Sequence, residues 1–246
     1  MNDLPPRRGK KPVRTLGFAL VWTGILLGMV IFGVLVSQHL EASFYFGYGV
    51  PADQPLRTLR CPVLLTTRES GVIGVALKNP GSQPISPQVR FEVSNHYGIR
   101  TLLSKPSIAP GETRPLYWTV TSDDVMFGNF IMVKVYAFSA PSFPSRLAQC
   151  GIFVLNLPFT TSRLVAAVML ALCWICLGSG AWLWVRANRP LDGRVKSGTT
   201  GLFVVISMVL VGMVLGALRL WAPGVFLFAL TVLLITVIAT YFYQPG

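Results

Sequence analysis

The chain has few charged side chains and very few of the side chains that enzymes and metal proteins use most. Only 12% of its 246 residues are charged, nine are acidic and two are histidines, His39 and His96. Soluble globular domains contain about a quarter charged residues, so this composition favours a membrane protein. Metal sites need clustered His, Cys, Asp or Glu. The adjacent acids Asp123 and Asp124 are typical of a solvated turn, so we expect no metal ion and no cofactor.

Charged residues are absent from the long apolar runs. Four such runs occupy residues 16–36, 164–185, 201–218 and 225–242. A helix needs about 20 apolar residues to cross the hydrocarbon layer of a bilayer. The runs therefore predict four transmembrane helices, with bounds at 15–38, 163–185, 200–218 and 225–243. Ion-coupled carriers usually place ionisable groups inside the membrane, so these uncharged runs argue against a transporter.

The first apolar run follows a basic tail. Residues 1–14 carry five basic side chains and three prolines, which is typical of a disordered segment. A secretory signal peptide also has a basic start and an apolar run. This run is longer than most signal-peptide cores, and Val36-Ser37-Gln38-His39 is a poor cleavage site. We therefore favour a retained anchor.

The positions of the basic residues predict an orientation. Five precede the first helix, four lie in the loop at 186–199, and one, Arg219, lies in the turn at 219–224. Short loops rich in Lys and Arg stay in the cytoplasm. We expect a multi-pass protein of the plasma or inner membrane, with both termini cytoplasmic and the segment between the first two helices outside. The basic residues form no dense stripe interleaved with aromatics, so we expect no nucleic-acid partner.

Aromatic residues gather where the predicted helices end. The segment 39–59 contains SFYFGYG and then a proline-broken stretch, and we interpret it as a juxtamembrane linker. Tyrosine and tryptophan favour the headgroup region, which wets their polar atoms and covers their rings. The predicted interface anchors are Tyr45, Tyr48, Trp182, Trp184 and Trp221.

Residues 60–160 alternate between apolar and polar side chains and are interrupted by turn signals. The predicted strands are 60–68, 72–78, 88–95, 99–104, 114–121, 129–138 and 147–157. About seven short, evenly spaced strands indicate an immunoglobulin-like β-sandwich. The alternation predicts that Val89, Phe91 and Val93 face the core, while Arg90, Glu92 and Lys134 lie on the other face.

The segment SIAPGETRPLYWTV, residues 107–120, resembles bacterial extracellular immunoglobulin-like modules of the CARDB and NEW3 type. In those modules a proline-glycine turn and a polar residue lead into an alternating strand. The resemblance covers fourteen residues and implies a β-sandwich. It implies no ligand.

Two cysteines bracket the β region. With this region outside, Cys61 and Cys150 lie in a compartment where disulfides persist, and we predict that they form one. The alternative is two unpaired, buried thiols.

The other two cysteines, Cys173 and Cys176, form a CxxC motif inside the second helix. This resembles membrane thiol oxidoreductases of the disulfide-bond-forming and vitamin K epoxide reductase type. Those enzymes have four helices, a CxxC beside a quinone at a helix end, and an external cysteine pair. Here Cys173 lies about 14 Å inside the helix, with no nearby cation to stabilise a thiolate. We interpret both as small buried apolar residues.

Two glycine pairs have the small-xxx-small spacing that lets helices approach closely, Gly24 with Gly28 and Gly212 with Gly216. They are equally suited to packing this chain's own helices and to binding a partner's helix. The sequence therefore predicts a non-enzymatic membrane protein in contact with the lipid bilayer. Its role would be an accessory, scaffold or assembly component with other membrane-protein subunits. The alternatives are a surface binding or sensing module and, third, a quinone-linked thiol oxidoreductase.

Overall fold

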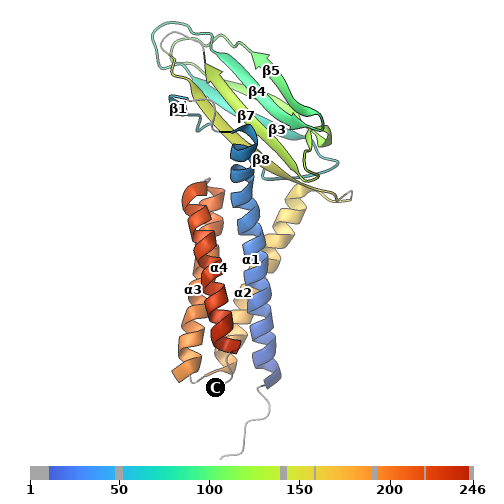
Figure 1. Cartoon of the computed structure of the whole chain (residues 1–246), viewed down its shortest axis with the longest axis vertical. Coiled ribbons are helices and arrows are strands. Elements are labelled where there is room, and N and C mark those ends of the chain that lie inside the picture. Colours follow the sequence, from blue (N-terminus) through green and yellow to red (C-terminus); the bar gives the residue numbers. More distant parts are fainter. Residues whose placement is uncertain are drawn as a thin grey trace, which may run out of the picture. The chain divides into compact units, whose positions relative to one another are not determined.

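A computed structural model describes residues 11–47, 52–138, 143–157, 159–189, 193–218 and 220–243. The chain divides into two compact units. The first comprises Met1–Val36 and Ala167–Gly246, and the second comprises Ser37–Ala166. We call them the helical unit and the β unit, because the described strands all lie in the second (Figure 1).

The described residues form four α-helices: α1 (Lys11–Phe46), α2 (Ser162–Ala187), α3 (Gly193–Ala217) and α4 (Trp221–Tyr243). In this part of the chain, three apolar spans are long enough to cross a membrane: Pro12–Phe46, Ser162–Ala187 and Val195–Ala217. The apolar part of α4, Ala222–Ile238, is shorter. The helices thus indicate a membrane-associated protein.

The helix ends differ from the sequence prediction. Helix α1 was expected to end at residue 38 but continues to Phe46, so the first part of the expected 39–59 linker is helical. No proline or glycine interrupts residues 39–46, and Gly47 then takes the left-handed conformation, with φ of 66°, that ends many helices. Helix α3 begins at Gly193 and α4 at Trp221, inside the expected loops at 186–199 and 219–224.

Part of the prediction lies outside the described residues. This applies to residues 1–10 of the basic tail, to Tyr48, and to Arg219.

Glycines bring α1 close to the other helices of the helical unit. A Cβ atom on Gly24 would lie 2.8 Å from the Leu177 side chain, and one on Gly28 would lie 2.6 Å from Cγ1 of Val209. The second predicted pair faces α1: a Cβ on Gly212 would strike the ring of Phe32, and one on Gly216 would lie 2.8 Å from Cβ of Leu35. Both pairs therefore pack against helices of the same chain.

The described residues of the β unit form eight strands. They are β1 (Gln54–Pro55), β2 (Leu64–Thr66), β3 (Gly71–Lys78), β4 (Gln88–Asn95), β5 (Gly98–Ser104), β6 (Thr113–Val120), β7 (Phe130–Phe138) and β8 (Arg146–Leu155). The larger, mixed sheet has the order β1-β8-β7-β4-β5, with β2 also paired to β8. The smaller sheet pairs β3 with β6. Each of the seven predicted strands is present, and β1 is an addition from the predicted linker.

Side chains from both sheets form one hydrophobic core. Val89, Phe91 and Val93 are fully buried, as the alternation predicts, and so are Ile73 and Leu77 of the smaller sheet. The core also joins the sheets through stacked rings. Phe91 of β4 lies parallel to Trp118 of β6, with ring centroids 4.8 Å apart. This stacking adds a directional contact to the apolar burial.

A disulfide joins Cys61 and Cys150, which confirms the predicted pairing; their Cα atoms are 6.6 Å apart. Cys150 lies in β8 of the larger sheet. Cys61 follows Arg60, whose backbone pairs with Gly74 of β3 in the smaller sheet. The bond therefore links β8 of the larger sheet to the segment that pairs with β3 of the smaller sheet.

Removing this disulfide should weaken the β unit strongly. The cysteines are 89 residues apart, and a cross-link across a loop of that length stabilises by about 4–5 kcal/mol in the chain-entropy model. We expect the double variant Cys61→Ser, Cys150→Ser to lose the protease resistance of its β unit at a much lower urea concentration. Cys176→Ser, which removes a free thiol, is the control. Equal midpoints for both variants and the wild type would contradict this role.

Glycines in α2 allow a matched test of helix packing. A Cβ on Gly180 would lie 2.6 Å from the backbone nitrogen of Val21 in α1, whereas a Cβ on Gly178 would meet nothing within 4 Å. We expect Gly180→Ala to destabilise the helical unit by about 1–3 kcal/mol through overpacking. Gly178→Ala should be neutral or stabilise by about 0.5–1 kcal/mol. Thermal unfolding in detergent measures both, and the same midpoint for the two variants would contradict the packing.

Candidate functional site

The last ten residues of α1 lie on the outer face of the larger sheet, beside β7 and β8 (Figure 1). Gln38 and Ala42, one helical turn apart, are 4% and 0% exposed. Gly151 of β8 allows the close approach, because any Cβ there would overlap the carbonyl group of Gln38. The Gln38 side chain also donates a hydrogen bond of 2.7 Å to the carbonyl of Val63. The end of α1 is thus a packed part of the β unit.

A buried ion pair lies on this covered face. Nζ of Lys134 is 3.3 Å from a carboxylate oxygen of Glu92, and the two side chains are only 9% and 13% exposed. The Lys134 ammonium group also lies 5.5 Å from the ring centroid of Phe46, near the end of α1. Glu92 and Lys134 lie on the sheet face opposite Val89, Phe91 and Val93, as the alternation predicts. The sequence pattern of a strand does not reveal that a helix covers this polar face.

Tyr45 contacts protein groups on the same unit. Its hydroxyl donates a 3.0 Å hydrogen bond to the carbonyl of Gly98, the first residue of β5. Its ring lies edge-on to Phe127, with centroids 6.3 Å apart. The expected headgroup anchor Tyr45 therefore joins the end of α1 to the start of β5 and to the turn at Phe127.

The predicted tryptophan anchors have different surroundings. Trp184 is buried at 4% exposure, and its indole N–H donates a 3.0 Å hydrogen bond to the hydroxyl of Thr199 in α3. Trp182 is 58% exposed and lies 5.0 Å from the guanidinium group of Arg186. Trp221 begins α4, and its side chain lies outside the described residues. Trp184 is thus a packing residue, since α3 supplies the polar partner that a headgroup layer would otherwise provide.

Glu69 holds the start of α2 against the β unit. One of its carboxylate oxygens accepts hydrogen bonds from the backbone N–H of Ser162 at 2.9 Å and from the backbone N–H and hydroxyl of Thr66, both at 3.0 Å. Desolvation raises the pKa of Glu69, but these hydrogen bonds outweigh it and hold the pKa below its ordinary value. A carboxylate at a helix N-terminus satisfies a free N–H and the helix dipole together. The β unit is therefore attached to helix ends through both of its chain connections.

Asp124 also has a structural role. It is 3% exposed and forms an ion pair of 2.9 Å with Arg100, and it accepts a hydrogen bond from the backbone N–H of Thr121. The prediction of a solvated pair at Asp123 and Asp124 therefore fails for Asp124. Its partner Arg100 lies in β5, 24 residues away in the sequence.

Exposed aromatic rings mark one surface of the β unit. Tyr97 is 97% exposed and Phe127 is 71% exposed. Phe127 has a φ of 51°, a left-handed conformation that strains any residue with a branched or bulky side chain. Strained backbone with an exposed apolar ring is a feature of binding surfaces. The sequence around Phe127 predicted only a turn, and nothing in its pattern indicates the positive φ.

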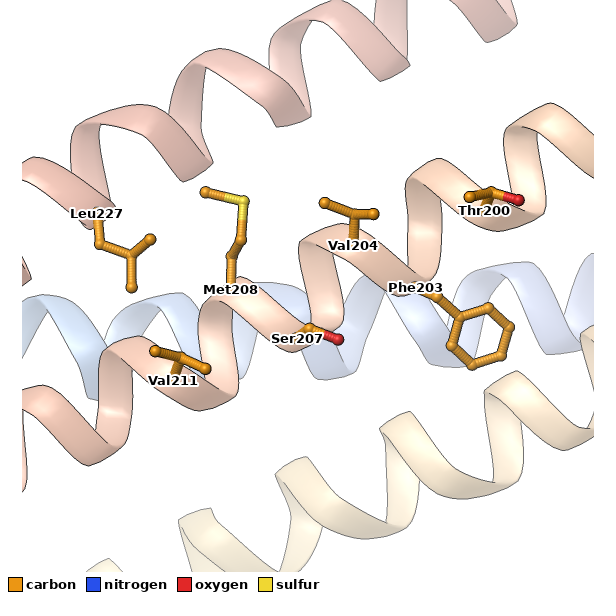
Figure 2. Close-up of a pocket in the computed structure, with 7 residues that line it drawn as sticks. All are labelled: Thr200, Phe203, Val204, Ser207, Met208, Val211 and Leu227. Atoms are coloured by element: carbon orange, nitrogen blue, oxygen red, sulfur yellow. The ribbon is translucent and has the colours of Figure 1, made fainter.

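A shallow groove of about 370 Å³ runs along α3 in the helical unit. Figure 2 shows Val204, Met208 and Val211 along one side of α3, with Leu227 of α4 pointing towards Met208. The groove also contains hydroxyl groups. Those of Thr200 and Ser207 line it, and Thr200 donates to the carbonyl of Lys196 at 3.1 Å. Such groups on the face of an apolar helix can bind across to a second helix.

Of the two free cysteines, Cys173 provides a packing contact and Cys176 is only partly buried, so the prediction that both are buried holds for Cys173 alone. Cys173 is fully buried, and its thiol donates to the carbonyl of Gly24 in α1 at 3.5 Å. Within the described residues no group of three or more His, Cys, Asp or Glu side chains is placed to hold a metal ion.

Comparisons with known proteins find little that resembles this chain. No protein-family model matches it, and no curated protein is similar to it in sequence. Among solved structures it is similar to crystal structures of a β-glucosidase from Listeria innocua, in complex with gluconolactone and with glucose. For each, the identity is 14%, the TM-score is 0.30, and the match covers 40% of this chain and 16% of the glucosidase chain. A TM-score this low supports no conclusion about fold or activity.

The junction at Glu69 predicts a pH-dependent stability. Because the folded-state pKa lies below the ordinary value of 4.5, the contribution of Glu69 is complete above that pH and is lost as the pH falls through the folded-state pKa. We expect Glu69→Gln to weaken the β unit at neutral pH by about 1 kcal/mol. We also expect a smaller loss of stability than in the wild type between about pH 5 and about pH 3.

The measurement is the urea midpoint for proteolysis of the β unit at each pH. Asp123→Asn, which alters the exposed acid beside Asp124, is the matched control and should follow the wild-type pH profile. Parallel profiles for Glu69→Gln and the wild type would contradict the proposed hydrogen-bonded role of the carboxylate.

Proposed function

We propose that this is a non-enzymatic integral membrane protein that presents an immunoglobulin-like β-sandwich on the outer face of the cell membrane. Four transmembrane helices carry the domain, and both termini are cytoplasmic. Its role is that of an accessory, scaffold or assembly component of a larger membrane complex. The common core of the two sheets supports the sandwich, and the distribution of basic residues supports the orientation.

The observation that carries this proposal is the attachment of the β unit at both of its chain connections. The end of α1 packs on the larger sheet through Gln38 and Ala42, and Glu69 binds the first turn of α2. A ligand-binding module can function on a flexible linker. A scaffold has to present a defined surface to its partners, and helix ends packed on the sheet provide one.

The helices also have more surface than the β unit needs for anchorage. Gly24, Gly28, Gly212 and Gly216 are used within the chain, so they are not free to bind a partner. The groove on α3 has an open apolar surface and the exposed hydroxyl of Ser207. We propose that this groove binds a transmembrane helix of another subunit, because a hydroxyl group gains more from a partner helix than from lipid chains.

Site-specific photocrosslinking in native membranes tests this proposal. A benzoylphenylalanine at Ser207, in the groove, should crosslink to a membrane protein that co-migrates with this chain in stoichiometric amount after mild detergent extraction. The same probe at Val209, which is fully buried on the same helix, should give no such product. A chain that migrates alone or only with copies of itself, without a crosslink at Ser207, would contradict an accessory role.

A second candidate function is a surface binding or sensing module, and the exposed ring of Phe127 favours it. The backbone of Phe127 is strained, and its ring is exposed to solvent next to Tyr45. A peptide, glycan or envelope protein could contact the ring there. Crosslinking from Phe127 but not from Tyr117, an equally exposed ring on the smaller sheet, would favour this function. Equal crosslinking from the two positions would count against it.

A further inference from the structure

Arg68, Phe159 and Arg163 belong to two chain segments that meet at the start of α2. Arg68 follows β2, and Phe159 and Arg163 flank the first residue of the helix. The hydrogen bond from the Ser162 N–H to Glu69 joins the two segments, because Arg68 precedes Glu69 and Arg163 follows Ser162. The guanidinium group of Arg68 lies 5.6 Å from the ring centroid of Phe159. We call Arg68, Phe159 and Arg163 the α2-start cluster.

The cluster has two positive charges that are available for a ligand. Arg68 and Arg163 are exposed and form no ion pair with another described residue. Glu69 is the nearest acid in sequence, and its bonded oxygen already accepts from Ser162 and Thr66. The helix N-terminus is satisfied by Glu69, so recognition of an anion would come from the two guanidinium groups. These groups bind phosphate oxygens with paired hydrogen bonds.

The surroundings of Phe159 indicate which kind of anion the two arginines would bind. Its ring is 90% exposed beside an arginine, three residues before an apolar helix of 26 residues. Such a helix is about 39 Å long, more than the hydrocarbon thickness of about 30 Å, so its ends reach the headgroup layer. A phenyl ring there can enter the acyl boundary while arginine side chains extend to the phosphates. A phenyl ring exposed to water gains no such apolar contact.

We propose that the α2-start cluster binds the headgroup of an anionic phospholipid in the leaflet where α2 begins. Arg68 and Arg163 donate hydrogen bonds to the phosphate, and the ring of Phe159 packs against the glycerol and upper acyl region. This inference rests on the proposed function in one respect, which is that α2 crosses the membrane. It adds a specific lipid contact that steadies the β unit against the membrane surface.

Crosslinking from Phe159 tests the site directly. The full chain with Phe159→p-benzoylphenylalanine is reconstituted in vesicles of equal parts phosphatidylglycerol and phosphatidylcholine, irradiated and analysed by mass spectrometry. We expect lipid adducts at position 159 that favour phosphatidylglycerol by at least about fivefold, since one arginine near an anionic surface contributes on that order. Adding Arg68→Gln and Arg163→Gln should bring the ratio of the two lipids close to one.

Matched variants and competitors make the result specific. Arg57→Gln with Arg114→Gln, which removes two exposed arginines elsewhere in the β unit, should leave the ratio unchanged. An absence of lipid adducts, or a ratio that survives Arg68→Gln with Arg163→Gln, would overturn the proposal. So would loss of the adducts on adding soluble glycerol phosphate, because the site would then bind a free phosphate ester.

The same vesicles separate this proposal from the proposed function. A chain that alkaline carbonate removes from the vesicles is not membrane-spanning, which would overturn both. A chain that resists carbonate but forms no adduct at position 159 would overturn the headgroup site alone.

Discussion

The structure depends on the continuity of α1. This helix runs without a break from Lys11 to Phe46 and takes part in both compact units. Phe32, Leu35 and Val21 contact the other helices in the first unit, and Gln38 and Ala42 cover a sheet in the second. A helix interior satisfies its own backbone groups, so this segment can leave an apolar layer and pack on a sheet without exposing unpaired polar groups. A break at residue 39 would uncover the sheet face that carries Lys134.

The charged side chains of the β unit serve mainly to hold its parts together. Lys134 and Glu92 pair beneath the end of α1, Asp124 pairs with Arg100, and Glu69 binds the start of α2. A buried charge without a partner is costly, so each pair works only when its segments are correctly placed. These contacts therefore stabilise one arrangement of turns and helix ends relative to others. They also leave Arg68 and Arg163 as cations beside α2 that have no acidic partner among the described residues.

Much of the fold could be predicted because it depends on local patterns. Alternation at Val89, Phe91 and Val93 marks a strand with one buried face, and an uncharged run such as 164–185 marks an apolar helix. The pairing of Cys61 with Cys150 followed from their positions at the two ends of the β region. The candidate sites were harder to predict. The hydrogen bonds of Glu69 and the groove beside Ser207 depend on segments that are apart in the sequence. No residue pattern indicates the positive φ of Phe127.

The sequence by itself determined the apolar helices, seven of the eight described strands, the membrane-like composition and the disulfide. Periodicity, hydropathy and cysteine position are properties of short stretches, whereas the two-residue strand β1 has no such pattern. Only the tertiary structure decided which faces are covered. Lys134 and Trp184 are buried because α1 and α3 lie over them, and Tyr45 binds Gly98 because the start of β5, 53 residues away, comes within reach. Burial of this kind is set by contacts between elements, and no single element's pattern records it.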